Sequence, residues 1–263
     1  MSKQISSAQN PTIKKLSQLQ GSSRARRKEG LFVIEGLREL QLALKAGYEI
    51  ETLFYDSTLI VQDQVEIWAP QAEHIEIASA LYAKLAYRGS TEGVLAFAKA
   101  KSHELSDLSL KNDPLILVAE SPEKPGNIGA LLRTADAAGI DAVCIANPKT
   151  DLYNPNIIRS SVGALFTVPI AIGSTAEIIS VLQDLKIAIY SAILQEAIPY
   201  TQADYKKASA LVVGTEDEGL SMAWREASEQ NIIIPMNGQL DSMNVSVAAA
   251  VLIFEAVRQR QSL

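Results

Sequence analysis

Leu115-Ile116-Leu117-Val118-Ala119 is an uninterrupted apolar run that begins directly after Pro114. Such a run is typical of a strand in a parallel sheet that is covered on both faces. Similar runs follow at residues 142–146, 187–190, 210–213 and 232–234, and helical patterns occur at 128–138, 176–185, 222–227 and 245–260. This alternation predicts an α/β domain with a mostly parallel sheet. The default is a doubly wound fold with its ligand at the carboxyl ends of the strands.

Residues 36–101 alternate between helical and extended patterns in shorter segments. We expect helices at 37–44, from Ser57 and at 80–87, a turn at Gly89, and strands at 51–55, 74–77 and 93–98. Gly47 ends the first of these helices, because a left-handed C-terminal position favours glycine. These segments predict a small α/β sandwich at 1–101, a polar linker at 102–113 and a second domain at 114–263.

The composition excludes several kinds of site. The chain has 263 residues, of which 48% are hydrophobic and 21% charged, and this disfavours disordered and fibrous proteins. Cys144 is the sole cysteine and there are two histidines, so we expect neither a disulfide nor a metal site. No apolar run reaches the roughly 18 residues of a membrane span, and we find no secretion signal. We therefore expect a cytoplasmic protein with no membrane partner.

The net charge of −6 conceals a basic N-terminal segment. Residues 1–28 carry no acidic side chain and seven basic ones, which are Lys3, Lys14, Lys15, Arg24, Arg26, Arg27 and Lys28. One interpretation is a solvated surface or a transit peptide, and the other is a contact for nucleic acid. Phosphate backbones bind clusters of Lys and Arg, so RNA is a candidate partner of this basic arm.

The loop after Ala119 leads into a helix that carries two candidate residues. Asn127 has the side chain of a helix N-cap, because its oxygen can accept from an otherwise unpaired amide of the first turn. Arg133 follows six residues later, among apolar and small residues. It is either a solvated arginine or one that points into a cleft to hold a phosphate or an oxyanion.

Two further loops follow predicted strands. Gly214-Thr215-Glu216-Asp217-Glu218-Gly219-Leu220-Ser221 has nearly the spacing of a P-loop, but Leu220 replaces the required lysine. A loop whose backbone approaches a neutral or cationic cofactor, with Glu216 as an acceptor, is the better interpretation, and a plain acidic turn is the alternative. Ser242 and Asn244 precede the last helix and suit capping. No G-x-G-x-x-G fingerprint follows a strand, which argues against a dinucleotide-dependent oxidoreductase.

Together the three loops resemble the three motifs of the SpoU (TrmH-like) branch of the SPOUT RNA methyltransferases. The matching residues are Asn127-x5-Arg133-Thr134-Ala135, Gly214-x-Glu216-x-Glu218-Gly219-Leu220-Ser221, and Ile234-Pro235-Met236 followed by Ser242-Met243-Asn244-Val245-Ser246-Val247-Ala248. The segment from Arg159 to Phe166 is also similar to the family, and Asn10-Pro11 and Phe32-Val33-Ile34-Glu35-Gly36 are similar to its substrate-binding domain. The resemblance covers nearly the whole chain.

The resemblance implies a C-terminal domain with a trefoil knot and an N-terminal domain like small ribosomal proteins that bind RNA. It implies methyl transfer from S-adenosylmethionine to a ribose 2′-hydroxyl, with ribosomal RNA as the expected substrate and transfer RNA as the alternative. A different class, a non-catalytic RNA-binding or ribosome-assembly homologue, stays open. It is disfavoured because no matched residue is chemically incapable of its role.

The resemblance also implies roles for individual residues. The implied catalytic group is Arg133, which would activate the hydroxyl, with Asn127, Glu216, Ser242 and Asn244. The implied cofactor contacts are Gly214, Thr215, Gly219, Ile234, Met236 and Met243, of which Met243 replaces the leucine of many members. The expected RNA contacts are Lys14, Lys15, Arg24, Arg26, Arg27, Lys28 and Arg159. The helix at 245–260 is apolar nearly all round, so we expect a homodimer through the C-terminal domain, and the alternative is a helix buried within its own domain.

Overall fold

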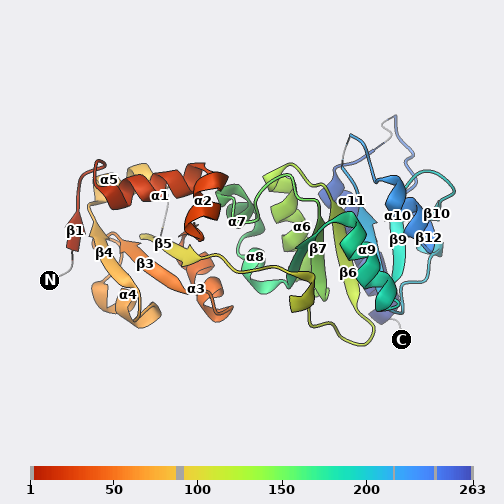
Figure 1. The fold of residues 1–263 in the computed structure, drawn as a ribbon, viewed down its shortest axis with the longest axis horizontal. Helices are drawn as coiled ribbons and strands as arrows, with labels where there is room; N and C mark the ends of the chain where they lie inside the picture. The colour runs from red at the N-terminus through yellow and green to blue at the C-terminus, as the bar shows by residue number, and fades with distance from the viewer. Residues whose placement is uncertain (1–2, 87–91, 216, 240–241, 262–263) are drawn as a thin grey trace. The chain divides into compact units, whose positions relative to one another are not determined.

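A computed structural model describes residues 3–86, 92–215, 217–239 and 242–261. The chain forms two compact units (Figure 1). The first comprises Met1–Ser102 and Asp151–Thr167, and the second comprises His103–Thr150 and Val168–Leu263. Most of the predicted linker therefore groups with the second unit, where residues 105–107 form the 3-10 turn η1 (Leu105–Asp107). The segment 151–167, which the sequence pattern places in the second domain, groups with the first unit.

The first unit contains a five-stranded sheet in the order β1-β4-β3-β5-β2. Its strands are β1 (Lys3–Ile5), β2 (Leu31–Glu35), β3 (Ile50–Tyr55), β4 (Glu73–Ile77) and β5 (Val94–Lys99). Both β1 and β3 run parallel to β4, whereas β5 is antiparallel to β3 and β2. The helices are α1 (Pro11–Gly21), α2 (Ser23–Glu29), α3 (Leu37–Lys45), α4 (Gln62–Trp68), α5 (Ser79–Leu85), α7 (Pro155–Ser161) and α8 (Ala164–Thr167). The small α/β unit is thus confirmed.

The expectation of a helix from Ser57 is wrong. The side chain of Asp56 accepts from the amide of Thr58 at 3.0 Å and from its hydroxyl at 2.7 Å. Such local side-chain bonds favour a turn over a helix, and α4 begins later, at Gln62. The helix predicted at 80–87 ends at Leu85, and Gly89 lies outside the described residues.

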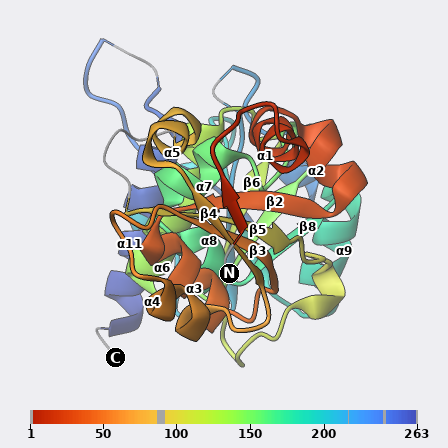
Figure 2. The same ribbon diagram turned by 90° about the vertical axis from the view of Figure 1, so that its left-hand side faces the viewer.

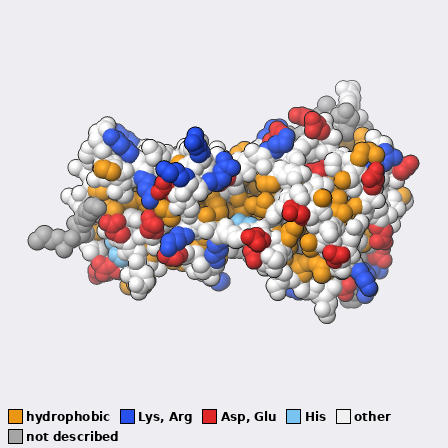
Figure 3. All heavy atoms as spheres, in the orientation of Figure 1, with side chains coloured by type: hydrophobic (Ala, Val, Ile, Leu, Met, Phe, Trp, Pro, Cys, Tyr) orange, Lys and Arg blue, Asp and Glu red, His pale blue; other side chains and the backbone are white. Residues whose placement is uncertain are grey.

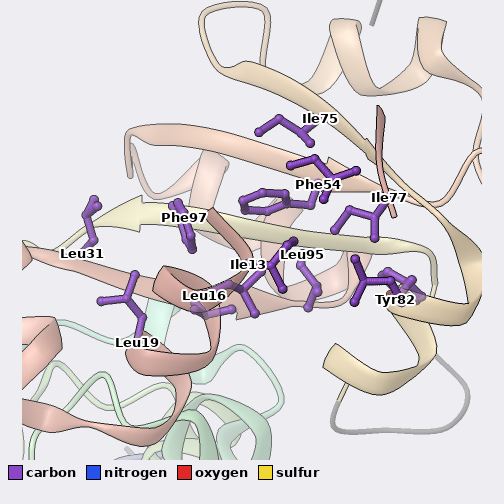
Figure 4. Close-up of a cluster of buried hydrophobic side chains, with 13 residues drawn as sticks. Ile13, Leu16, Leu19, Leu31, Phe54, Ile75, Ile77, Tyr82, Leu95 and Phe97 are labelled. Carbon is purple, nitrogen blue, oxygen red and sulfur yellow. The ribbon is translucent and has the colours of Figure 1, made fainter. Parts of the chain in front are cut away.

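The basic N-terminal segment is not an arm, because its helices form part of the core of the first unit. Ile13, Leu16 and Leu19 lie on one face of α1 and are fully buried. Figure 4 shows this face against the sheet, near Leu95 and Phe97 of β5. The residue spacing of three matches one side of a helix, so Lys14, which lies between these positions, is left exposed on the outer side.

The second unit contains a seven-stranded parallel sheet in the order β10-β12-β9-β11-β6-β7-β8. Its strands are β6 (Leu115–Glu120), β7 (Ala142–Ala146), β8 (Ile170–Gly173), β9 (Ala188–Ala192), β10 (Ile198–Pro199), β11 (Ser209–Val213) and β12 (Gln230–Ile233). The mostly parallel sheet is confirmed. In a simple doubly wound sheet, β9 would pair with β6. That expectation is wrong, because β11 lies between β6 and β9. The trefoil knot stays an expectation.

Helices cover both faces of this sheet, as the continuous apolar strands predict. On one side lie α9 (Thr175–Asp184) and α10 (Met222–Ala227), whose Ile178, Leu182 and Trp224 pack with Val118 of β6. On the other side α6 (Pro125–Ala138) packs along α11 (Val245–Gln261), and Figure 2 shows α6 and α11 across the sheet from α9. None of the described helices is long and apolar enough to cross a membrane.

Candidate active site

A cavity of about 120 Å³ lies in the second unit, at the carboxyl ends of β6 and β11. It joins the loop after β6, the loop after β11 and the start of α11. Its lining residues are Ala119, Glu120, Pro122, Glu123, Lys124, Asn127, Leu131, Gly214, Thr215, Asp217, Glu218 and Val245. Two of the loops singled out in the sequence, and the start of the helix that the third loop enters, therefore border one site at the edge of a parallel sheet where α/β proteins bind ligands.

The loop after β11 is a tight turn in which two stretches of backbone touch. Thr215 and Gly219 exchange two backbone hydrogen bonds of 3.0 and 3.2 Å, and the Thr215 hydroxyl accepts from the amide of Glu218 at 3.0 Å. A Cβ added to Gly214 would lie 2.2 Å from the carbonyl carbon and oxygen of Gly219. Position 214 therefore requires glycine. The predicted catalytic residue Glu216 is outside the described residues.

Asn127 and Asn244 connect the first motif to the third. The Asn244 side-chain Nδ2 donates to Oδ1 of Asn127 at 3.1 Å. Asn244 also caps α11, because its Oδ1 accepts from the amide of Ser246 at 3.0 Å and from the Ser246 hydroxyl at 2.6 Å. The prediction that Asn127 is an N-cap is wrong: α6 begins at Pro125, which suits the first helical position, so Asn127 lies inside the first turn.

Glu120 is a site residue that the sequence analysis missed. Its carboxylate is buried and accepts from the amide and the hydroxyl of Ser221, both at 2.8 Å, and from the hydroxyl of Thr175 at 2.6 Å. Glu120 thus ties the far end of the loop after β11 to the ends of β6 and α9. A carboxylate at the end of an otherwise apolar strand was the signal that could have found it.

Arg133 does not line the cavity. It is exposed on α6, two residues after Leu131, and at about 100° per residue its side chain leaves the helix about 200° away from that lining residue. Among the other predicted residues, Ser242 and Met236 are exposed, and Ile234 and Met243 are half-buried outside the lining. The structure therefore brings together Asn127, Asn244, Gly214, Thr215 and Gly219, but not the remaining candidates.

The lining of the cavity is acidic. Glu120, Glu123, Asp217 and Glu218 contribute carboxylates, against the single ammonium of Lys124. Glu123 also pairs with Lys149 at 2.9 Å, and this hydrogen bond raises the pKa of Lys149 above its ordinary value. Such a surface repels a free phosphate and tolerates a cation. Within the described residues, no group of His, Cys, Asp or Glu side chains is arranged to hold a metal ion.

The candidate RNA contacts lie in the first unit, mainly on α1 and α2. Arg24, Arg27 and Lys28 are exposed on α2, and Lys14 is exposed on α1. Figure 3 shows Lys and Arg side chains gathered over these helices. Lys15 is half-buried beside Glu29 and Glu51, at 3.7 and 3.6 Å. Arg159 of α7 is half-buried and donates to the side chain of Asn156 at 2.8 Å.

The prediction that Arg26 contacts RNA is wrong. It is 5% exposed and pairs with Asp151, with its Nε donating to Oδ2 at 2.9 Å. Its Nη1 also donates to the carbonyl of Leu19 at 2.5 Å. A buried arginine paired in this way cannot turn to a phosphate without leaving Asp151 as an uncompensated charge. Arg26 therefore has a structural role, and it fastens the segment 151–167 within the first unit.

Residues 114–254 match the sequence profile of the SpoU rRNA Methylase family, and residues 10–96 match the MRM3-like substrate binding domain. The chain belongs to the SpoU rRNA Methylase family. The predicted resemblance is thereby confirmed along both parts of the chain. The profile spans all three loops around the cavity, so the site described above is the region that the SpoU family shares.

Relatives of known activity are similar over nearly their whole length. The 23S rRNA (uridine(2479)-2′-O)-methyltransferase of Streptomyces viridochromogenes is 30% identical over 97% of this chain and 92% of its own. The 23S rRNA (guanosine(2553)-2′-O)-methyltransferase RlmP of Bacillus subtilis is 31% identical over 96% and 98%. The S-adenosylmethionine-bound rRNA methyltransferase of Sinorhizobium meliloti has the same fold, with a TM-score of 0.90 at 26% identity over 98% of each chain. The SpoU fold thus extends to both units.

Proposed function

We propose that this SpoU family chain transfers the methyl group of S-adenosylmethionine to a ribose 2′-hydroxyl of ribosomal RNA. The observation that carries the proposal is the site itself, in which the three family motifs border one acidic cavity. Both relatives named above act on 23S rRNA at a 2′-O position, one at a uridine and the other at a guanosine. We therefore assign the same class of reaction to this chain. The target nucleotide differs between the two relatives, so the proposal names none. A cytoplasmic location stays a prediction.

The residues present fit the cofactor. S-adenosylmethionine supplies a methyl group on a positively charged sulfonium, and the carboxylates of the cavity tolerate that charge. Gly214 and Thr215 line the cavity, and the turn packs so tightly against Gly219 that position 214 has no room for a side chain. The cavity is smaller than the roughly 300–1,000 Å³ of pockets that enclose a whole small ligand. It would therefore hold a part of the cofactor, with Ile234, Met236 and Met243 beside the rest.

The catalytic task of the protein is to orient the hydroxyl and to stabilise the charge that develops on its oxygen as the proton leaves. A guanidinium offers a permanent positive charge and five donors, so Arg133 can bind the developing oxyanion or the adjacent phosphate. The hydrogen bond between Asn127 and Asn244 holds α6 against the start of α11. This contact would position the helix that carries Arg133. Ser242 and Glu216 are proposed polar contacts of the same site.

The proposal is tested by methyl transfer. Purified protein is incubated with labelled S-adenosylmethionine and total RNA from a strain that lacks this protein, and the labelled ribose is mapped. We expect label at one ribose of ribosomal RNA. Label confined to transfer RNA would identify transfer RNA as the substrate instead. RNA binding without cofactor binding or methyl transfer would identify a non-catalytic homologue.

A homodimer through the second unit is part of the proposal. Val247, Val251 and Phe254 follow one another along α11 at intervals of one turn, and Val247 and Phe254 are 52% and 49% exposed. An apolar stripe of this kind calls for a partner. A second copy over α11 would also lie beside α6 and its Arg133, because the two helices pack together.

We expect light scattering at micromolar concentration to give twice the 28.4 kDa mass of the chain. Phe254→Glu should shift the protein to the monomer, because it buries a charge in the apolar contact. A monomeric wild-type protein at that concentration would refute the proposed interface.

RNA affinity should depend on salt through the exposed cations of α2. Each phosphate contact contributes about 0.7–0.9 to the slope of log affinity against log salt. Replacement of Arg24, Arg27 and Lys28 by glutamine should therefore flatten that slope by about 2 to 3, measured by fluorescence anisotropy with ribosomal RNA fragments. Replacement of three exposed lysines of the second unit, Lys186, Lys206 and Lys207, is the matched control. If both triple variants changed the salt slope equally, α2 would not be part of the RNA-binding surface.

A further inference from the structure

The first unit contains a second cavity, which none of the roles assigned above uses. Its volume is about 400 Å³, within the range of small-ligand pockets, and it lies among α1, α2, β2, α3 and α7. Val33, Pro155 and Ile158 give it apolar walls, while Glu35 and Glu39 contribute carboxylates. All of these elements belong to the first unit, including α7 from the segment 151–167.

Glu39 is the informative residue of this cavity. Its side chain lines the cavity from the first turn of α3 and is 5% exposed. Within the part of the chain that the structure describes, its carboxylate has no hydrogen bond and no ion pair. The backbone makes room for it, since a Cβ on Gly36 would lie 2.8 Å from Oε2 of Glu39. The Glu39 oxygens are not among the fully buried polar atoms that lack a partner, so they face the open space of the cavity, where a ligand with hydrogen-bond donors would bind them.

We propose that this cavity binds an unpaired guanine base of the substrate RNA, through its Watson–Crick edge and the carboxylate of Glu39. Guanine presents two adjacent donors on that edge, N1–H and the N2 amino group, and a carboxylate accepts both at once. Adenine and cytosine present one amino donor beside an acceptor, and uracil presents one N–H between two carbonyls. The apolar walls suit the faces of a planar base. The inference rests on the proposed function in one respect, that the substrate is RNA.

The surrounding charges favour a nucleotide within RNA over a free amine or another cation. Arg26, which lines the cavity, belongs to the same short helix as the exposed Arg24, Arg27 and Lys28. Arg159 lines the cavity as well. Arg26 stays paired with Asp151, whereas the exposed Arg24, Arg27 and Lys28, together with Arg159, would bind the phosphates on either side of an inserted base and would repel a polyamine.

The experiment compares three short RNAs by fluorescence anisotropy with the full chain and without cofactor. Each is a uridine heptamer whose central residue is guanosine, inosine or adenosine. Inosine keeps N1–H and lacks the amino group, so we expect affinities in the order guanosine, inosine, adenosine, with on the order of tenfold between the first and the last. Glu39→Gln presents one acceptor and one donor, so it should reduce that difference to within about twofold.

Glu49→Gln is the matched control, because Glu49 is an exposed carboxylate of the same unit and should leave the preference intact. Equal affinities of the wild-type protein for the three RNAs, or a guanosine preference that survives Glu39→Gln, would overturn the proposal. Methyl transfer is measured separately on the same preparations. Methylation of ribosomal RNA without a guanosine preference would overturn only the guanine-binding proposal. A guanosine preference without methyl transfer would overturn only the proposed reaction.

Discussion

Replacement of Arg133 by alanine is expected to lower the rate of methyl transfer by about 10²- to 10⁴-fold, the usual scale for a positioned group that assists proton transfer. The affinity for S-adenosylmethionine should not change, because Arg133 does not line the cavity between the three motif loops. The fold should also survive, since the side chain is exposed. The rate is measured in single turnovers on ribosomal RNA, and the cofactor affinity by calorimetry.

Two further variants make this result specific. Arg133→Lys keeps the charge but loses the planar fork of donors, so it should recover only part of the rate if two contacts to one phosphate or oxyanion matter. Arg225→Ala removes another arginine of the second unit, one that pairs with Glu196 at 3.2 Å, and should leave the rate near that of the wild type. Full activity of Arg133→Ala would assign the activation of the hydroxyl to another group.

The parallel sheet of the second unit was predictable because each long strand is apolar on both faces. Leu115 to Ala119 and Ala142 to Ala146 are buried at every position, and such runs are visible in a sequence. Two strands escaped prediction: β8 has four residues and β10 only two. The order of the strands could not be derived either, because β11 reaches its place between β6 and β9 through contacts between residues far apart in the chain.

The candidate site was predictable in part. The motif loops were found because they follow predicted strands, and the family resemblance then implied roles for their residues. The structure joins Asn127 to Asn244 across 117 residues of sequence. The role of Arg26 was missed because no helix was expected at residues 23–29, so the buried and exposed cations of that segment could not be separated. Its partner Asp151 lies 125 residues away. Glu39 was missed for a different reason: its helix was predicted, but a glutamate in an amphipathic helix gives no sign of burial.

Gly214→Ala should weaken S-adenosylmethionine binding by on the order of 100-fold, because overpacking of a tight contact costs about 1–3 kcal/mol or more. The new methyl group would meet the backbone of Gly219 at 2.2 Å, and backbone cannot turn aside as a flexible side chain can. The turn closed by Thr215 and Gly219 must therefore open. Calorimetric titration with S-adenosylmethionine measures the loss, and thermal unfolding shows whether the sheet has remained intact.

Gly126→Ala is the matched control for this substitution. Gly126 lies in the first turn of α6, next to Asn127, but a Cβ there has no atom within 4 Å. The same added methyl group should therefore leave cofactor affinity unchanged, and alanine is the better helix former. If Gly214→Ala bound S-adenosylmethionine as tightly as Gly126→Ala does, the closed turn after β11 would not be the part of the protein that grips the cofactor. The contacts would then have to come from the third loop, residues 234–244, and from Met243 within it.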